Sequence, residues 1–165
     1  MKHSIIISIA AAIVLTAAGC ACNKTKNNTA KTDLQPSSVI EATVARNYFV
    51  NNTFSDSEDK EEYIITTKQE FNTVFSPAAF MGKDGEVTEI DFKKQFALCV
   101  VLNATDIHKD LQLIEVKSDN DGGIVCNYRL VMGRKQSYMS RPCLIVVLDR
   151  KYIDKQISFH RVFVR

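Results

Sequence analysis

Five cysteines and three histidines are the residues of this 165-residue chain whose types could support nucleophilic or metal chemistry. A cysteine nucleophile needs a neighbouring histidine and a thiol whose pKa is lowered. Cys143 and His160 form the best such pair, because an antiparallel pairing of their two strands would bring them together. Neither residue follows a glycine-rich elbow or the start of a helix. The sequence therefore favours a protein that is not an enzyme.

Three of the cysteines, Cys99, Cys126 and Cys143, lie inside apolar runs that we expect to be strands. Cysteine in such a run usually behaves as a small buried hydrophobic residue. A disulfide between two of the three is the second interpretation, since an oxidising compartment permits one. A reactive thiol is the third, and the sequence leaves all three open. Cys22 lies in a polar segment near the N-terminus.

Metal and phosphate sites have little support. His108 and Asp110 offer two metal ligands without a third. The run Asp119–Gly123 resembles the start of a calcium loop, but it lacks the later glutamate that closes such a site. An Asn-Asp-Gly-Gly run between two apolar segments instead predicts a hairpin turn. No glycine-rich phosphate loop is present in the sequence. We expect no metal and no cofactor.

Charge is distributed unevenly along the chain. Residues 129–165 hold nine basic and two acidic side chains, whereas residues 1–128 hold 12 basic and 17 acidic ones. The net charge of +2 argues against a general nucleic-acid binder. A basic end can steer an acidic partner or stay near anionic lipid headgroups, and it can also serve solubility alone.

The segment Met132–Pro142 carries the most distinctive side chains of this basic region. It is predicted to be a loop between two strands, and it holds a tyrosine, two methionines and three basic residues. Tyrosine, methionine and arginine are enriched at protein–protein interfaces. We predict that it binds a protein partner through Arg134, Lys135, Tyr138, Met139 and Arg141. The alternative is a hairpin loop whose Tyr138 and Met139 fold back onto the core. The acidic loop Asp56–Glu62 is a second candidate surface.

The N-terminus has the composition of a secretion signal. A short basic segment precedes the uncharged run Ser4–Ala18, which is shorter than the roughly 20 apolar residues of a membrane-spanning helix. The run ends in Ala17-Ala18-Gly19-Cys20, which resembles the bacterial lipobox. In that family the signal peptide is removed and the cysteine receives lipid. The resemblance implies a signal peptide over residues 1–19, a lipidated Cys20 and attachment to a membrane.

Residues 20–38 are polar and are predicted to form a flexible tether. Surface-exported lipoproteins of one bacterial group carry acidic residues directly after the cysteine, whereas the first acidic residue here is Asp33. That comparison favours an outer-membrane protein facing the periplasm and leaves surface exposure open. Residues 39–165 are then expected to form a single globular domain.

The globular part shows mostly strand patterns. Thr67 and Glu70 fit a capping box, which predicts one short helix near residues 67–75, with Phe71 on its apolar face and Pro77 ending it. We expect an α+β fold, a mostly antiparallel sheet of about six strands in a meander with the helix packed on it. A small barrel or sandwich remains an alternative. Expected strands lie at residues 39–50, 63–65, 87–92 leading into 96–102, 111–116, 124–132, 143–148 and 157–164.

Part of this pattern is similar to a known family. The strings are Thr66–Phe71, Ile90–Leu98, Arg141–Val147 and Ile157–Phe159. They resemble the C-terminal domain of PrcB-type lipoproteins, which are accessory subunits of bacterial protease complexes. The resemblance covers residues 64–160 and implies a protein that is associated with a protease or inhibits one. The Arg141–Pro142 step also resembles one element of chagasin-type inhibitors of cysteine proteases.

Overall fold

The computed structural model describes residues 38–55, 61–78 and 85–163. The predicted signal peptide, Cys20 and almost all of the tether lie outside these ranges, and so do residues 56–60 of the acidic loop. The described elements, in chain order, are β1 (Val39–Ile40), β2 (Thr43–Val44), β3 (Tyr48–Val50), β4 (Glu62–Ile65), α1 (Lys68–Val74), β5 (Phe75–Pro77), β6 (Gln95–Val101), β7 (Thr105–Ser118), β8 (Ile124–Ser140), β9 (Cys143–Asp149), the short 3-10 helix η2 (Arg150–Tyr152) and β10 (Ile157–Phe163).

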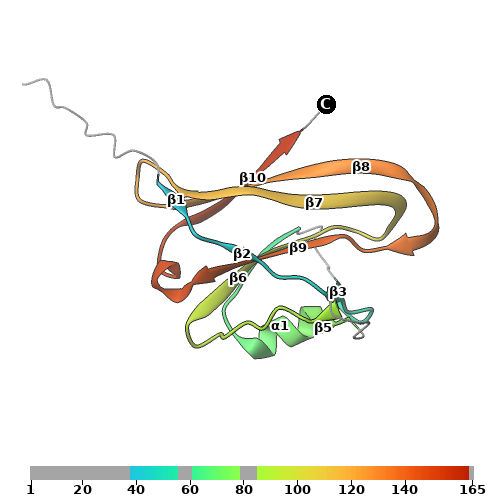
Figure 1. The fold of residues 1–165 in the computed structure, drawn as a ribbon, viewed down its shortest axis with the longest axis horizontal. Coiled ribbons are helices and arrows are strands. Elements are labelled where there is room, and N and C mark those ends of the chain that lie inside the picture. Colours follow the sequence, from blue (N-terminus) through green and yellow to red (C-terminus); the bar gives the residue numbers. More distant parts are fainter. Residues whose placement is uncertain (1–37, 56–60, 79–84, 164–165) are drawn as a thin grey trace, which may run out of the picture. The chain divides into compact units, whose positions relative to one another are not determined.

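The strands form two four-stranded sheets and one pair of short strands. The first sheet has the order β1-β7-β8-β10, the second has the order β2-β9-β6-β4, and β3 pairs with β5 (Figure 1). All pairings are antiparallel except that of β10 with β8, which is parallel. The expectation of a mostly antiparallel β fold with one short helix is confirmed. The described residues nevertheless form ten strands where about six were expected.

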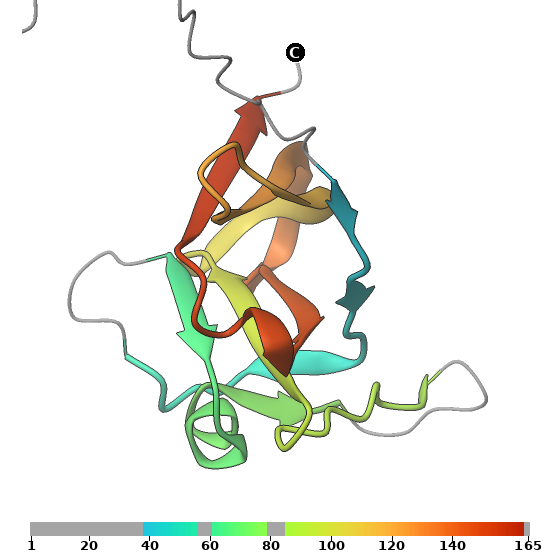
Figure 2. The ribbon, with the colours of Figure 1, turned by 90° about the vertical axis from the view of Figure 1, so that its left-hand side faces the viewer.

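The second sheet is covered on both faces, which explains its unbroken apolar sequence. Along β6, Phe96, Leu98 and Val100 face the first sheet, where they pack with β7 and β8 residues. The alternate residues Ala97, Cys99 and Val101 face α1 and β5. Side chains alternate between the faces of a strand, so a strand buried on both faces needs apolar residues throughout. Figure 2 shows α1 and β5 on the side of the second sheet opposite β10.

The single strand expected over residues 39–50 is in fact three short ones. β1 pairs with β7 in the first sheet, β2 with β9 in the second, and β3 with β5. Asn47 has a φ of 63°, in the left-handed region, and it lies just before β3. The segment therefore crosses between layers, and its alternating pattern could not reveal this because each piece pairs with a different, distant strand.

The helix begins as the capping box predicts. The Thr67 hydroxyl accepts a hydrogen bond from the Glu70 amide at 3.2 Å, and the Glu70 carboxylate accepts one from the Thr66 amide at 3.2 Å. α1 ends at Val74, and Pro77 lies in β5 rather than at the helix end. The strand expected over residues 87–92 is absent from the described part of that segment, which turns at residues 92–94 before β6.

Candidate binding site at the end of the β7–β8 ribbon

The segment predicted as the loop Met132–Pro142 is mostly strand, and that prediction is wrong. β8 continues to Ser140 because β7 begins at Thr105, six residues before the predicted start, and pairs with it. β1 reaches only Val116 along β7, and β10 reaches only Leu130 along β8. Residues 105–110 and 131–140 therefore form a two-stranded ribbon that no other described strand flanks (Figure 1). Residues 111–113 of β7 continue its open edge, but their partners in β8 are flanked by β10.

Two irregularities reshape the β8 side of this ribbon. Between the pairs Ile107–Lys135 and Lys109–Met132, two residues of β8 lie opposite His108. Between the pairs Thr105–Ser140 and Ile107–Lys135, the four residues 136–139 lie opposite the single residue Asp106. Bulges re-aim side chains and interrupt pairing. The second bulge holds Tyr138 and Met139, each of which is 63% exposed.

The ribbon concentrates exposed apolar side chains. A two-stranded ribbon that extends beyond its sheet cannot bury both faces, so apolar residues there remain in contact with solvent. Tyr138 and Met139 therefore do not fold back onto the core, which was the alternative that the sequence left open. The exposed large apolar residues of the ribbon are Ile107, Val131, Met132, Tyr138 and Met139.

The basic residues predicted to bind a partner differ in their surroundings. Arg134 is exposed on the ribbon. Lys135 Nζ lies 2.9 Å from Asp106 Oδ2 across the ribbon, in a pair whose side chains are 77% and 41% exposed. An ion pair as exposed as this stabilises a protein by well under about 1 kcal/mol. Arg134 and Lys135 are thus available to a partner at low cost.

Arg141 instead supports the base of the ribbon. Its Nη1 donates a hydrogen bond of 2.5 Å to the Phe54 carbonyl, and its guanidinium carbon lies 5.2 Å from the centroid of the Phe54 ring. The side chain is half-buried. This double contact holds the 51–55 loop against the start of β9. Arg141, which the sequence groups with the partner-binding residues, therefore also has an internal contact.

A hollow of about 500 Å³ lies beside the bulge. It separates the bulge from the 51–55 loop and from the connection between β6 and β7. The Asn51 side chain donates hydrogen bonds to the carbonyls of Asn72 and Thr73, which connect this part of the lining to the end of α1. The sequence analysis did not include Phe54 and Asn103 among the candidate site residues. The only signal for Phe54 was that it is a lone aromatic residue in a polar loop. The lining residues are Asn51, Asn52, Phe54, Ser55, Asn103, Ala104, Met139, Ser140 and Arg141.

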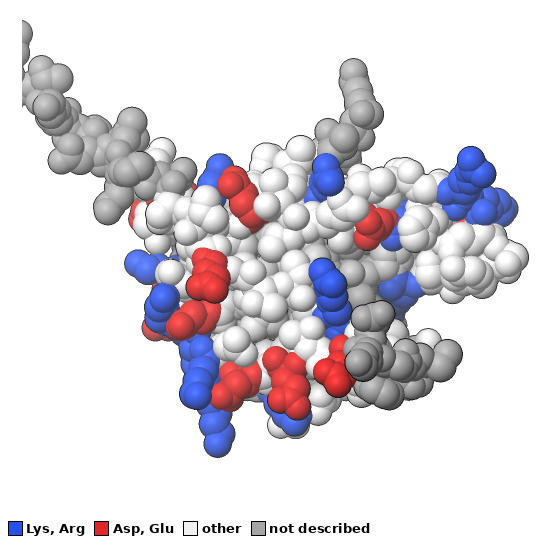
Figure 3. All heavy atoms as spheres, in the orientation of Figure 1, with Lys and Arg blue, Asp and Glu red and all other residues white. Residues whose placement is uncertain are grey.

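The basic C-terminal region does not form one free patch. Arg129 donates to the Gln112 side chain at 2.8 Å, and Arg150 donates to the carbonyls of Thr66 and Phe92. Arg161 is bound by Glu61. Figure 3 shows basic side chains at the free end of the ribbon and a mixture of acidic and basic ones along the lower part of that face. Several of the basic side chains that make residues 129–165 positively charged are therefore engaged in contacts within the domain.

The cysteines in the described residues are free thiols. Cys99 and Cys143 belong to the apolar cluster between α1 and the second sheet, and Cys126 belongs to the cluster between the two four-stranded sheets. Burial raises the pKa of Cys143 to about 11, and burial followed by the nearby Glu62 raises that of Cys126 to about 12. Burial also raises the pKa of Cys99. These shifts keep all three thiols protonated at neutral pH, away from nucleophilic chemistry.

The antiparallel strand pairing that would have brought Cys143 and His160 together is not formed. β10 runs parallel to β8 in the first sheet, whereas Cys143 begins β9 in the second. His160 Nδ1 lies 3.0 Å from the Asn127 side-chain oxygen. No group of three or more metal-ligating residues occurs within the described ranges.

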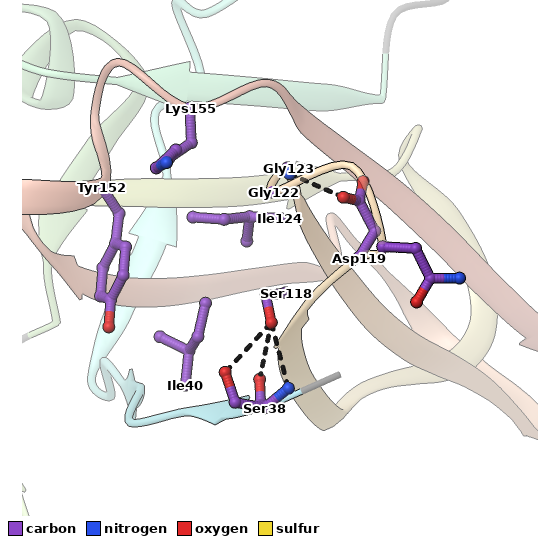
Figure 4. Close-up of a pocket in the computed structure, with 10 residues that line it drawn as sticks. Ser38, Ile40, Ser118, Asp119, Gly122, Gly123, Ile124, Tyr152 and Lys155 are labelled. Carbon is purple, nitrogen blue, oxygen red and sulfur yellow. Dashed lines mark hydrogen bonds between the residues drawn. The ribbon is translucent and has the colours of Figure 1, made fainter. Parts of the chain in front are cut away.

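The predicted hairpin turn is confirmed, and a second hollow lies beside it. Asp119 Oδ1 accepts hydrogen bonds from the amides of Asp121 and Gly123 at 2.9 and 2.6 Å, and Gly122 takes a φ of 79° that favours glycine. The hollow has a volume of about 410 Å³, and Figure 4 shows it between this turn, Tyr152 and Lys155.

Comparisons with family models, with curated proteins and with solved structures yield no match for this chain. No helix within the described ranges is both long and apolar enough to cross a membrane.

Proposed function

We propose that this chain is a lipid-anchored protein of the bacterial cell envelope that acts by binding another protein. The observation that carries the proposal is the ribbon end, where Tyr138 and Met139 project from a bulge and are 63% exposed. Exposed aromatic and methionine side chains beside Arg134 have the composition of an interface centre. The adjacent hollow offers a place for a partner's side chain.

The anchor rests on the N-terminal pattern that ends in Ala17-Ala18-Gly19-Cys20. If Cys20 carries lipid, the Cys20→Ala variant should keep its signal peptide and lose stable attachment to membranes. Membrane fractionation and the mass of the N-terminal peptide measure both effects, and Cys22→Ala is the matched control. Unchanged processing and membrane association in Cys20→Ala would refute the anchor. We place the protein on the periplasmic side of the outer membrane, with surface exposure as the alternative.

For the partner class we propose a protease, on the basis of the resemblance to PrcB-type lipoproteins. The residues that carry this resemblance lie mainly on α1, β6, β9 and β10, which build the core rather than the ribbon. The resemblance therefore supports the partner class, and the exposed ribbon supports the place of contact. To distinguish association with a protease from inhibition of one, the purified chain is added to the captured enzyme and the rate of proteolysis is measured. Inhibition lowers that rate, whereas association alone leaves it unchanged.

Site-specific photocrosslinking in host cells tests the proposal. A photoreactive amino acid at position 138 or 139 should give an adduct of discrete mass, and the adduct should be lost when Arg134→Ala and Lys135→Ala are added. The matched control places the same amino acid at Ile64 of β4, which is 44% exposed and lies outside the ribbon. Adducts of equal yield at position 64, or none at 138 and 139, would contradict binding through the ribbon.

A carrier for a small hydrophobic ligand is the second candidate. The hollow of about 410 Å³ favours it, because Ile40, Ile124 and Tyr152 contribute apolar surface there (Figure 4). A carrier purified from its host should show bound small molecules in native mass spectra, and Tyr152→Ala, at a partly buried lining residue, should reduce them. Empty spectra would count against this candidate.

A further inference from the structure

The outer edge of β7 is an unfilled place for one more strand. β1 occupies the C-terminal end of this edge, where Val39 pairs with Lys117 and Ile40 with Val116. The Ser118 amide donates a 3.0 Å hydrogen bond to the Ser38 carbonyl in the same ladder. After Ile40 the chain leaves for the second sheet, where β2 pairs with β9. Beyond that point no described strand pairs with the outer edge of β7.

The open part of this edge is regular. Residues 105–113 of β7 run without an extra residue of their own, since both irregularities in that stretch lie on the β8 side. The only extra residue on β7 is Ile114, which separates the open part from the part paired with β1. Nine residues of strand span about 30 Å. By contrast, the free edge of β8 is interrupted by its two bulges, so it is a poorer template for pairing.

Natural proteins usually shorten, bulge or cover an edge strand, because its free amides and carbonyls recruit other strands. The edge of β7 is long, contains no proline over residues 105–113 and has apolar side chains near both ends. Ile107 is 36% exposed and Ile114 is 48% exposed. An extended peptide backbone can form hydrogen bonds with such a row of amides and carbonyls by adding to the sheet as one more strand.

We propose that an extended segment of the protein partner adds to residues 105–113 of β7 as an antiparallel strand, in line with β1. This inference rests on the proposed function and specifies how the partner is held. Nine residues of edge turn about four or five amides and as many carbonyls toward an added strand. The Ile107 amide of this stretch already donates to the Thr105 hydroxyl at 3.1 Å, a contact that an added strand would have to replace or leave in place. Backbone hydrogen bonds are the same for any partner sequence, so side-chain contacts must supply the specificity.

The two faces of the added strand meet different surroundings. On the core side it lies next to Leu111 and Leu113, near Ala42 and Val44, which are partly buried against the main core. On the outer side it lies next to Asp110 and Gln112, whose side chains are hydrogen bonded to each other. The partner segment should therefore alternate apolar residues facing inward with polar residues facing outward.

Hydrogen exchange of the full chain with a synthetic nine-residue peptide that alternates valine and threonine tests the inference. Alternate amides of residues 105–113 should exchange about tenfold more slowly with millimolar peptide, since they gain partners. The control is the same peptide N-methylated at every residue, which lacks amide donors and should give no protection.

Two proline variants supply an independent check. The amides of successive residues in a strand point alternately to its two sides. Of His108→Pro and Lys109→Pro, one variant therefore removes an amide that points to the open edge, and the other removes an amide that points to β8. The variant that keeps the native exchange pattern elsewhere should lose the protection by the peptide.

Three results would overturn the inference: no protection by the peptide, protection on β8 instead, or protection without peptide that grows with protein concentration. The last would mean that a second copy fills the edge. Photocrosslinking at Tyr138 is independent of this test. A failed peptide experiment beside a specific adduct would remove only the strand addition, whereas absent adducts would remove the proposed function.

Discussion

Cys143 shows how burial decides the chemistry of a residue whose type alone suggests reactivity. Its thiol lies at the border of the core beneath α1, and desolvation raises its pKa to about 11. Arg141, two residues before it, shows the reverse. Its type suggests a free interface residue, but its contacts with Phe54 commit it to the loop. The chemical role of a residue in this protein therefore depends on its burial and contacts as well as on its type.

We predict that the native thiols are nearly inert at pH 8. A thiol of pKa about 11 is roughly one-thousandth thiolate at that pH, so alkylation of Cys143 should be slow. Alkylation with iodoacetamide, mapped to Cys99, Cys126 and Cys143 by mass spectrometry, measures the effect against protein unfolded in urea. Equal rates in the native and unfolded protein would contradict the burial of these side chains.

The same pKa shifts predict a loss of stability in alkali. The folded pKa values of Cys126 and Cys143 lie above their ordinary value of 9.0, so the unfolded chain releases these protons first. The contribution to the free energy of unfolding is complete below pH 9 and falls as pH rises toward 11 and 12. Urea midpoints at about pH 8 and 10 measure it. A Cys143→Ala variant with the same pH dependence as the wild type would argue against Cys143 as a source.

At the scale of elements, the helix and the ribbon have different origins. α1 begins at a local capping box, so nearby residues are sufficient to place it. The ribbon depends on pairing between β7 and β8, and it accommodates bulges because no neighbouring strand enforces its register. Local signals are therefore informative for α1 and misleading for the segment 132–142.

Removing the cap should weaken the helix. Thr67→Ala removes the hydroxyl that accepts from the Glu70 amide, and such a loss costs about 1 kcal/mol. Urea unfolding of Thr67→Ala measures this against Lys68→Ala, which changes an exposed residue next to the cap. If both variants unfold at the wild-type midpoint, the capping box contributes nothing to stability.

Gly133 should be required by its contact with His108. A Cβ added at Gly133 would lie 2.7 Å from His108 Cδ2 and 2.9 Å from His108 Cβ, which is closer than packing allows. We expect Gly133→Ala to cost about 1–2 kcal/mol and His108→Ala to recover most of that loss. A double-mutant cycle in urea measures the coupling. Additive effects of the two substitutions would contradict the contact.

At the scale of the whole molecule, a polar cluster joins the two sheets. Tyr128 of β8 is fully buried, and its hydroxyl donates to Glu62 of β4 at 3.0 Å. Arg161 of β10 donates to the same hydroxyl at 3.1 Å and also binds Glu61. The burial of Tyr128 raises its pKa, so the hydroxyl keeps the proton that it donates. The cluster connects β4 of the second sheet with β8 and β10 of the first sheet, to which no ladder among the described strands joins it.

Tyr128→Phe should destabilise the domain. The substitution leaves Glu62 and Arg161 without their shared partner in a part-buried place, at a cost of about 1–3 kcal/mol. Tyr138→Phe is the matched control, because the exposed ribbon hydroxyl should change stability by less than about 0.5 kcal/mol. Urea midpoints compare the two, and a Tyr128→Phe variant as stable as the control would show that the cluster is dispensable.

Sequence alone identified the features that depend on near neighbours. The capping box at Thr67 and the turn Asp119–Gly123 are closed by hydrogen bonds within a few residues. The apolar runs of β6 and β9 were also predicted as strands, and the structure explains their composition, because strands buried on both faces need apolar side chains throughout. The aromatic, methionine and basic composition of residues 132–141 also marked the candidate site before its shape was known.

Only the tertiary structure decided how these pieces pair. It divided residues 39–50 among three sheets, turned β10 parallel to β8, and extended β7 to make the ribbon. It also separated Arg141 from Tyr138 and Met139 by giving it an internal partner. Strand pairing satisfies backbone groups that are alike at every residue, so no local pattern specifies which distant strand supplies them.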